Sequence, residues 1–418
     1  MKHDICVLGL GYIGLPTASI FATKGKKVLG VDVVPRVVDT INRGEIHIEE
    51  PDLDVLVRAA VQSGNLRAAT VPAPAAVYII AVPTPFIVTP DNPRAPDLTY
   101  VEAATRSVAP VIEPGALVIL ESTSPVGTTE LMREWLREEL ARDPARAARF
   151  AAPDSLLFAH CPERILPGQM LKELVSNDRI AGGLTPAAAE QAKRLYQVFC
   201  SGEIFLTDAR TAELAKLTEN SYRDVNIAFA NELSLICDRL GIDVWELIRL
   251  SNRHPRVKIL QPGPGVGGHC IAVDPWFIVA AAPAEARLIR TAREVNDSKP
   301  HHVVAQVATA AGPGGETVIA CLGLTFKADV DDMRESPAVE IVKLLAEHMA
   351  GRLLVVEPHA RALPRELLGL PVELTTLPDA LARARVVVLL VNHREFLNPG
   401  ASALAGKTVI DTRGIWRT

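Results

Sequence analysis

The chain has 418 residues, with 44 lysines and arginines against 49 aspartates and glutamates, and a formal net charge of −5. Hydrophobic residues make up 48% and charged residues 22%, which excludes a disordered chain and leaves no uncharged apolar stretch of membrane-spanning length. The absence of a basic run argues against nucleic acid as a partner. A chain of this length predicts roughly two or three domains.

Six cysteines are scattered without any CxxC pair: Cys6, Cys161, Cys200, Cys237, Cys270 and Cys321. Disulfide and zinc frameworks show dense, regular spacing, so this pattern favours a reducing cytoplasm. The pairs His160-Cys161 and His269-Cys270 predict no metal site, because adjacent side chains diverge in direction and no ligand spacing recurs. The start, MKHDICVLGLGYIG, has the glycines of a strand and turn, so no export is expected.

From Ile5 to about residue 200, short apolar runs alternate with helical stretches, as in ICVLGL, VLGVDVV, VYIIAVP and LVILEST. Each run ends in glycine, proline or a polar residue, which is the rhythm of a parallel α/β sheet. A long helix without glycine or proline is predicted from about Thr211 to Leu240, with Gly241 as its C-terminal cap. A second helix is predicted from about Glu285 to Asn296, and the irregular QPGPGVGGHC loop lies between the two.

A second α/β rhythm begins near Gly315, with TVIACLGLTFK, LLVVEPHA, VVVLLVNH and TVIDTRG. VDVV in the first half and VVEPHA in the second each put an acid, Asp32 or Glu357, at the end of the expected second strand. The second half lacks a glycine triplet and predicts a degenerate nucleotide fold. The expected fold class is α/β, with two Rossmann-like doubly wound parallel-sheet domains joined by a long helix and a small helical domain. The expected boundaries are 1–205, 206–300 and 301–418.

The first motif is Gly9-x-Gly11-x-x-Gly14, which follows a strand, opens a helix and precedes Asp32 by 18 residues. Glycines there permit a tight turn, a close approach of backbone to pyrophosphate, and close helix packing. Asp32 should accept from ribose hydroxyls and repel a 2′-phosphate, which favours NAD over NADP. A glycine-rich turn without a ligand is the alternative, which the strand, helix and acid together disfavour.

The second motif is the loop from Gly263 to Cys270, followed four residues later by Asp274. A glycine-dense loop lets backbone amides surround a ligand, and a cysteine at its end is well placed for nucleophilic attack. The thiol needs a nearby cation or base for activation. A buried structural cysteine is the alternative.

The third constellation is Lys216, Asn220 and Arg223, which share one face of the long helix. A lysine beside Cys270 would lower the pKa of the thiol and stabilise an oxyanion, although a solvated polar stripe is the usual alternative. Cations also stand in three predicted loops, in segments 161–165, 253–256 and 326–334. Such cations suit diphosphate recognition.

With these residues assembled, the chain resembles the UDP-glucose/GDP-mannose dehydrogenase family over nearly its whole length. The resemblance is densest in GLGYIGLPTA, INRGEIHI, ESTSPVGTTE, CPERILPGQ, KLTENSYRDVNIAFANELSLIC, VWELIRLSNRHPRVKILQPGPGVGGHCIAVDPWF and DDMRESPA. The segment from Cys270 to Asp274 reads CIAVD, where the UDP-glucose branch usually has phenylalanine or leucine, proline and lysine between the two residues. CIAVD agrees with the acetamido-sugar branch.

The resemblance implies a role for each of three groups of residues. The catalytic residues would be Cys270 as nucleophile with Lys216, Asn220, Asp274, Glu163 and Thr123. NAD would contact Gly9, Gly11, Tyr12, Ile13, Gly14, Asp32, Arg36, Thr84, Thr123 and Arg334. The UDP-sugar would contact Arg164, Ile165, Lys216, Asn220, Arg223, His254, Arg256, Gly267, Phe326 and Lys327, with Arg256 serving the partner subunit of a homodimer.

The implied function is NAD-dependent, four-electron oxidation of a UDP-sugar at C6 by way of a thioester on Cys270, for bacterial surface polysaccharide synthesis. UDP-N-acetylmannosamine is the expected substrate, with UDP-N-acetylglucosamine and UDP-glucose as alternatives. A one-step short-chain oxidoreductase or epimerase would need a Tyr-x-x-x-Lys pair, and none of the five tyrosines has a lysine four residues on. The remaining alternative is a UDP-sugar-binding protein without catalysis.

Overall fold

The computed structural model describes residues 3–48, 50–87, 94–152, 154–165, 168–268, 270–313, 317–348 and 352–416. They divide into two compact units, Met1–Thr218 and Glu219–Thr418, and one long helix, α9 (Ala209–Leu240), belongs partly to each. The boundaries at 205 and 300 expected from the sequence stay a prediction.

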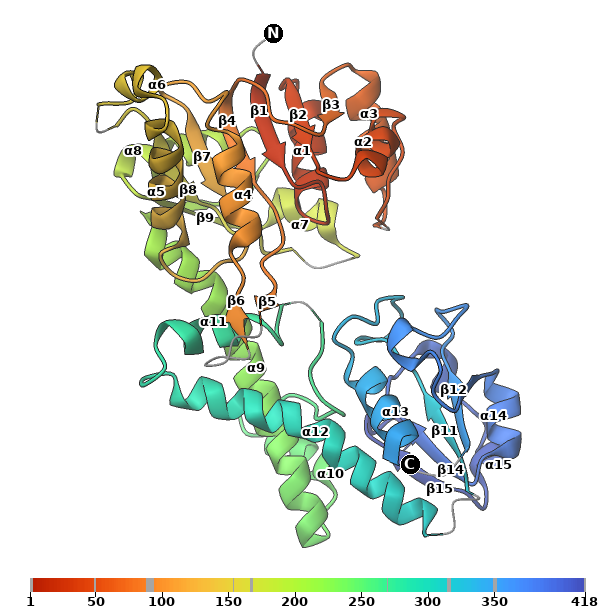
Figure 1. Ribbon diagram of the computed structural model, residues 1–418. Coiled ribbons are helices and arrows are strands. Elements are labelled where there is room, and N and C mark those ends of the chain that lie inside the picture. The colour runs from red at the N-terminus through yellow and green to blue at the C-terminus, as the bar shows by residue number, and fades with distance from the viewer. Residues whose placement is uncertain are drawn as a thin grey trace. The chain divides into compact units, whose positions relative to one another are not determined.

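The first unit is built on an eight-stranded sheet of order β10-β9-β8-β7-β4-β1-β2-β3 (Figure 1). Its strands are β1 (His3–Leu8), β2 (Val28–Val31), β3 (Leu66–Ala69), β4 (Ala75–Ile80), β7 (Leu117–Leu120), β8 (Leu157–His160), β9 (Arg179–Gly183) and β10 (Ile204–Asp208). The first six run parallel, whereas β9 pairs antiparallel with β8 and β10 runs parallel to β9. The expected parallel sheet is therefore confirmed, with two reversed strands added at one edge.

Helices cover both faces of this sheet. They are α1 (Gly14–Thr23), α2 (Pro35–Asn42), α3 (Leu53–Gln62), α4 (Thr99–Ser107), α5 (Thr128–Ala141), α6 (Pro144–Arg149), α7 (Met170–Ser176) and α8 (Pro186–Tyr196), beside a short hairpin of β5 (Phe86–Ile87) and β6 (Ala95–Pro96). Ile5 and Val7 of β1 pack with α1, α3 and α8, while Cys6 and Leu8 pack with α4 and α5. Because successive strand residues face opposite sides, both faces of β1 are apolar and buried.

The second unit combines a helical region with a five-stranded parallel sheet of order β13-β12-β11-β14-β15. The helical region contains the rest of α9, α10 (Val244–Ser251), α11 (Asp274–Ala281) and α12 (Arg287–Ala311). The sheet contains β11 (Val318–Leu322), β12 (Arg352–Val356), β13 (Val372–Leu374), β14 (Val386–Leu389) and β15 (Thr408–Asp411). Its helices are α13 (Pro337–His348), α14 (Leu377–Arg383) and α15 (Ala401–Leu404), with short 3-10 turns η1 (Arg365–Leu367) and η2 (Arg394–Phe396). Figure 1 shows α13 on one side of the sheet and α14 and α15 on the other.

The two long helices test the sequence pattern differently. Helix α9 matches the expected span, and Gly241 follows it with φ of +68°, a left-handed conformation that glycine adopts without strain. Helix α12 continues to Ala311, well past the expected end at Asn296, although it contains Pro300. Pro300 and Val303 are buried, and Val303 and Val307 pack in the core of the C-terminal sheet. Tertiary packing therefore overrides the usual tendency of proline to end a helix.

Candidate active site

The glycine turn of the first unit joins β1 to α1, and its three glycines have different surroundings. A Cβ on Gly9, whose φ is +88°, would lie 2.5 Å from the Ala81 carbonyl oxygen, and one on Gly14 would lie 1.8 Å from the Gly9 carbonyl oxygen. A Cβ on Gly11 would meet nothing within 4 Å. Gly9 and Gly14 are thus required by the turn, whereas Gly11 presents bare backbone to open space, as a phosphate-binding turn needs.

Asp32 follows β2 and is tied to this turn. Its two carboxylate oxygens accept the backbone N–H groups of Leu10, at 3.1 Å, and Val34, at 3.0 Å. A carboxylate has about four acceptor positions, so two remain for ribose hydroxyls. Tyr12 and Arg36 are exposed and Ile13 is half-buried. All of these residues lie at the carboxyl end of the parallel strands, where open α/β sheets bind ligands.

Thr84 and Thr123 extend this rim over the neighbouring strands β4 and β7, which pair in parallel. The Thr84 hydroxyl donates to the Thr123 carbonyl oxygen at 2.6 Å, and the Ser122 hydroxyl donates to the Val82 carbonyl oxygen at 2.7 Å. These bonds hold the two loops together and fix the backbone of Thr123 beside Thr84.

Glu163 lies in the loop after β8 inside a buried charged cluster that the sequence did not predict. One of its oxygens accepts from the Arg179 guanidinium at 2.6 Å and the other from the Arg164 backbone N–H at 2.7 Å. Arg179 also lies over the ring of Tyr196, whose hydroxyl donates to Glu121 at 3.0 Å. Burial, reinforced by the Glu163 charge, raises the pKa of Glu121 to about 8.

Lys216 is half-buried in the part of α9 that belongs to the first unit. One helical turn earlier, the Glu213 carboxylate accepts from the Gly127 N–H at 2.6 Å and from the Thr129 N–H at 2.8 Å, at the start of α5. This cap anchors α9 against the ESTSPVGTTE segment. Burial, aided by the Lys216 charge, lowers the pKa of His160 to about 3, so His160 is neutral at physiological pH.

Cys270 lies in the second unit, in the turn that precedes α11. Its carbonyl oxygen accepts the N–H groups of Val273, at 3.1 Å, and Asp274, at 2.9 Å. The buried Asp274 carboxylate in turn accepts from the Asn220 carboxamide of α9 at 2.5 Å. The structure thus brings together three of the expected catalytic residues, the cysteine with the acid and amide predicted beside it.

The six cysteines differ sharply in exposure. Cys270 is exposed, whereas Cys200 is half-buried and the remaining four are buried. Burial raises the pKa of the Cys6 and Cys321 thiols to about 12 and raises that of Cys161 further. Cys270 is therefore the most accessible of the six cysteines, as a nucleophilic thiol must be.

The glycine loop before Cys270 packs closely against the C-terminal domain within the second unit. A Cβ on Gly267 would lie 2.3 Å from the Glu335 carbonyl oxygen, and one on Gly268, whose φ is +84°, would lie 3.0 Å from the Phe326 ring. Two of the expected substrate residues, Gly267 and Phe326, are therefore neighbours. Lys327, next to Phe326, is exposed.

Arg413 was not predicted as a site residue. It follows β15, and its side chain lies against the beginning of the same loop. A Cβ on Gly263 would come within 2.8 Å of the Arg413 guanidinium, whose Nε donates to the Leu390 carbonyl oxygen at 2.9 Å. Desolvation lowers the pKa of Arg413 to about 10. The available signal was its place in TVIDTRG, directly after the last strand, where a cation suits a phosphate.

Four further predicted residues are exposed and are not brought to Cys270 by any recorded contact. Arg223 is on α9, and His254 and Arg256 follow α10, where the His254 ring accepts the Arg256 backbone N–H at 3.3 Å. Arg334, predicted to contact NAD, forms an ion pair with Asp332 at 2.6 Å. Their predicted contacts with ligands stay predictions.

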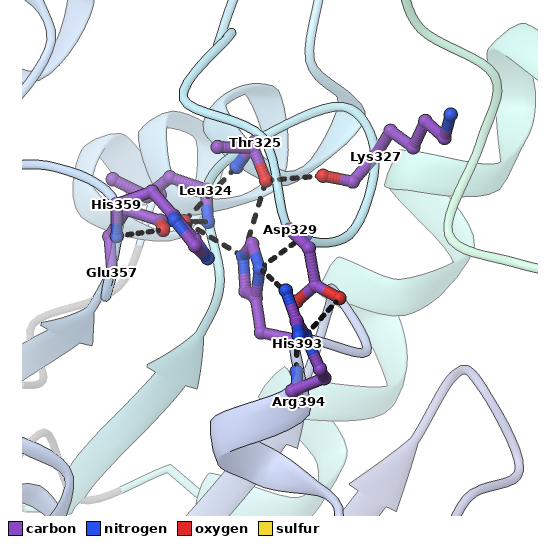
Figure 2. A network of polar contacts seen from close by, with 8 residues as sticks. All are labelled: Leu324, Thr325, Lys327, Asp329, Glu357, His359, His393 and Arg394. Atoms are coloured by element: carbon purple, nitrogen blue, oxygen red, sulfur yellow. Dashed lines mark hydrogen bonds and ion pairs between the residues drawn. The ribbon is translucent and has the colours of Figure 1, made fainter. Parts of the chain in front are cut away.

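Glu357 shows why the second nucleotide-like fold is degenerate (Figure 2). Like Asp32 it follows the second strand and accepts backbone N–H groups of the first turn, from Leu324 at 2.6 Å and Thr325 at 3.2 Å. Glu357 is buried, and the ring of buried His393 lies 3.2 Å from the same carboxylate oxygen. The Glu357 carboxylate is therefore occupied by hydrogen bonds inside the protein and is not available to a ribose.

The same region holds the one cluster with ligand-like spacing that was found in the described part of the chain: Asp329, His359, His393 and Glu395, with donor atoms within 4.8 Å of one another. Two of its four residues, His393 and Asp329, have partners, whereas the buried Nε2 atom of His359 has none among the described residues. The Nδ1 atom of His393 accepts the Asp329 backbone N–H at 3.0 Å, and the Asp329 carboxylate accepts from Arg394 at 2.9 Å. Figure 2 shows that Asp329 and His393, together with Arg394, form a polar brace within this domain.

Three family models match consecutive parts of the chain, all from the UDP-glucose/GDP-mannose dehydrogenase family. The NAD binding domain matches residues 3–200, the central domain residues 210–298, and the UDP binding domain residues 320–418. No helix in the described residues is long and apolar enough to cross a membrane.

Named relatives resemble the whole chain. An NDP-N-acetyl-D-galactosaminuronic acid dehydrogenase from Ralstonia nicotianae is 59% identical over 99% of this chain and 96% of its own length. A UDP-N-acetyl-D-mannosamine dehydrogenase from Escherichia coli is 56% identical over 99% of both chains. Among solved structures, the UDP-N-acetyl-mannosamine dehydrogenase of Staphylococcus aureus is 42% identical, with a TM-score of 0.86 over 99% of this chain and 96% of that one.

The fold, the glycine turn and these matches define an NAD-dependent dehydrogenase of nucleotide sugars. The chain belongs to the UDP-glucose/GDP-mannose dehydrogenase family.

Proposed function

We propose that this protein oxidises C6 of UDP-N-acetyl-D-mannosamine from alcohol to carboxylate, in two steps that share a covalent intermediate on Cys270. The observation that carries the proposal is the exposure of Cys270, at the end of a glycine loop and four residues before a buried acid, while no other cysteine is exposed. The E. coli and S. aureus relatives are named for this substrate.

The cofactor fits the first unit because Gly11 leaves room for a diphosphate beside the start of α1, and Asp32 keeps acceptor positions for ribose hydroxyls. Gly9, Gly14, Tyr12, Ile13, Arg36, Thr84 and Thr123 complete that surface, and Arg334 is assigned to the same ligand. When bound, NAD accepts two electrons as hydride at each oxidation. The Asp32 carboxylate would repel a 2′-phosphate, which makes NAD rather than NADP the cofactor.

In the first oxidation Lys216, or a water that it orients, takes the C6 hydroxyl proton while hydride leaves C6. The Cys270 thiolate then bonds to the aldehyde carbon and forms a thiohemiacetal. Thr123 is assigned to the polar groups around C6. Covalent capture keeps a reactive aldehyde from escaping.

In the second oxidation Lys216, or a water that it orients, takes the proton of the thiohemiacetal hydroxyl while C6 loses a hydride, which leaves a thioester on Cys270. Asp274 and Glu163 position the water that attacks it, while Lys216 and Asn220 stabilise the oxyanion. Hydrolysis breaks the carbon–sulfur bond, releases the carboxylate and restores the thiol. The bond from Asn220 to Asp274 supports this division of roles, because it orients both side chains at one place.

Recognition of the UDP-sugar is assigned to one set of residues: Arg164, Ile165, Lys216, Asn220, Arg223, His254, Arg256, Gly267, Phe326 and Lys327. Arg413 adds a cation beside Gly263, suited to the diphosphate. The CIAVD segment supports an acetamido sugar over UDP-glucose.

A second candidate substrate follows from the Ralstonia relative, which is 59% identical and named for an N-acetylgalactosaminuronic acid. The two sugars differ at C2, where the acetamido group is axial in the manno configuration, and at C4, where the hydroxyl is axial in the galacto configuration. The shape of the pocket, rather than the spacing of residues, distinguishes such differences. We therefore propose that the substrate is an acetamido sugar, and we rank UDP-N-acetylmannosamine ahead of UDP-N-acetylgalactosamine.

A substrate panel tests the assignment. Purified protein with NAD is given UDP-N-acetylmannosamine, UDP-N-acetylgalactosamine, UDP-N-acetylglucosamine and UDP-glucose separately, and kcat/KM is measured from NADH formation. The highest value should belong to UDP-N-acetylmannosamine. A higher value for another sugar would contradict the substrate, and NADH from none of them would favour a binding protein without catalysis.

We also propose that the protein is a homodimer joined through α9. Tyr222, Phe229 and Ile236 are 69%, 52% and 46% exposed and follow each other at intervals of seven residues. We propose that this apolar stripe of α9 packs against the same stripe of a second copy about a two-fold axis, as in other homodimer contacts. Arg256 is assigned to the partner's sugar site.

We propose that the protein works in the cytoplasm of a bacterium, in the synthesis of a surface polysaccharide.

A further inference from the structure

A chain of buried hydrogen bonds links the two long helices to the loop that carries Cys270. The chain begins at Asp224 of α9, whose carboxylate pairs with the Arg293 guanidinium of α12 at 2.6 Å. Both side chains are fully buried. Separating the two charges would leave each of them buried without its partner, which is costly, so the pair gives the rest of the chain a fixed starting point.

The next member is Asn296 of α12, whose carboxamide N–H2 donates to the Asp224 carboxylate at 2.8 Å and to the Asp224 carbonyl oxygen at 3.1 Å. The acceptors around Asp224 therefore fix which end of this carboxamide is which. Its oxygen faces the other way and accepts from the Asn231 carboxamide at 2.8 Å.

The last member is Asn231 of α9, which is fully buried. Because the Asn231 side-chain nitrogen donates to Asn296, the side-chain oxygen faces the loop and accepts the Gly263 N–H at 2.8 Å. Gly263 is also the residue against which the Arg413 guanidinium lies. Asn231 thus fixes the beginning of the loop beside a cation, while Phe326 packs on its other end at Gly268, two residues before Cys270.

We infer that Asn231 is a positioning residue for the Cys270 loop, and that the Asp224–Arg293 pair sets its orientation through Asn296. Asn231 acts through the backbone of Gly263 and not on the reacting atoms. This inference rests on the proposed function, since it deepens the account of the same site. A loop displaced by about 1 Å would cost on the order of 10²-fold in turnover.

The test uses the full-length protein and two readouts. One is kcat and KM for UDP-N-acetylmannosamine, and the other is the rate at which iodoacetamide alkylates Cys270 as a function of pH, followed by peptide mass. The second readout needs no substrate, so it separates failure of this inference from failure of the proposed function. Asn231→Ala should lower kcat by roughly tenfold or more and change the alkylation rate and its pH profile.

Ser234→Ala is the matched control. Ser234 is a buried residue of the same helix, bonded to Lys299 at 2.8 Å and to the Asn231 carbonyl oxygen at 2.6 Å, and has no recorded bond to the loop. Its loss should lower the thermal unfolding temperature while kcat and alkylation stay within about twofold of wild type. Should Asn231→Ala lower the unfolding temperature as Ser234→Ala does and leave both readouts unchanged, the inference is wrong.

Asn296→Ala gives an independent test, which also serves if Asn231→Ala does not fold. It leaves the Asn231 oxygen in place but removes the group that orients it, and Asn296 has no recorded bond to the loop. The same change in alkylation profile, smaller than that of Asn231→Ala, is expected. An unchanged profile in folded Asn296→Ala protein would overturn the orienting role.

Discussion

At the scale of single residues, exposure distinguishes Cys270 from the other cysteines. A thiol raised to a pKa of about 12, as in Cys6 and Cys321, is almost wholly protonated at neutral pH and shielded from any substrate. Cys270 is exposed and lies in the turn before α11. The covalent step of the proposal therefore has a single candidate nucleophile among the cysteines.

Cys270→Ser should lower the rate of sustained uronate formation by on the order of 10³-fold or more, because an alcohol replaces the thiolate that captures the aldehyde. Cys200→Ser is the control, since the Cys200 thiol is half-buried and donates to the Asn177 carbonyl oxygen at 3.4 Å. Uronate is measured by mass spectrometry. Sustained uronate formation by Cys270→Ser would contradict the covalent scheme.

Glu121 predicts a pH dependence of stability in the first unit. Burial raises its pKa to about 8, above the ordinary 4.5, so the folded protein holds a proton that the unfolded chain releases. The stabilising contribution is therefore complete below about pH 4.5 and is lost as pH rises through about 8. A fully linked proton corresponds to about 1.4 kcal/mol per pH unit.

The Glu121→Gln side chain cannot ionise, so the unfolding temperature of this variant should fall less than that of wild type between pH 4.5 and about 8, the interval from the ordinary to the raised pKa. Differential scanning calorimetry across that range measures the effect. Glu203→Gln, at an exposed position in the same unit, should follow wild type. Parallel curves for Glu121→Gln and wild type would show that Glu121 is ionised throughout.

At the scale of elements, the apolar stripe of α9 carries the prediction about assembly. Phe229→Glu places a charge in the middle of the stripe and should convert a dimer into a monomer, because a buried carboxylate without a partner is strongly unfavourable. Leu288→Glu is the control, because Leu288 is 69% exposed and belongs to α12. Light scattering gives the mass, and an unchanged dimer in Phe229→Glu would exclude this interface.

The elements also show where sequence patterns suffice. The span of α9 could be predicted because it lacks glycine and proline and ends at Gly241. The end of α12 could not, since Pro300 is held in the helix by packing of Val303 and Val307 against the C-terminal sheet. The antiparallel placement of β9 was equally out of reach, because strand direction is decided by pairing and not by the strand's own residues.

At the scale of the whole molecule, residues with a local signal were identified from sequence and those with only distant partners were not. Gly9, Gly14 and Asp32 reveal themselves by spacing after a strand. Arg179 matters because it contacts Glu163, and Arg413 and Asn231 matter because both contact Gly263. The fold brings these residues together from distant parts of the sequence. Long resemblance to a family supplied the site residues that periodicity alone did not.

The measurement that tests the central claim most directly is the number of NADH molecules formed for each UDP-N-acetylmannosamine consumed to completion, with the product identified by mass spectrometry. The account predicts two NADH and a uronate, because the half-oxidised carbon stays on Cys270 until the second hydride has left. One NADH per sugar with a free aldehyde as product would contradict it.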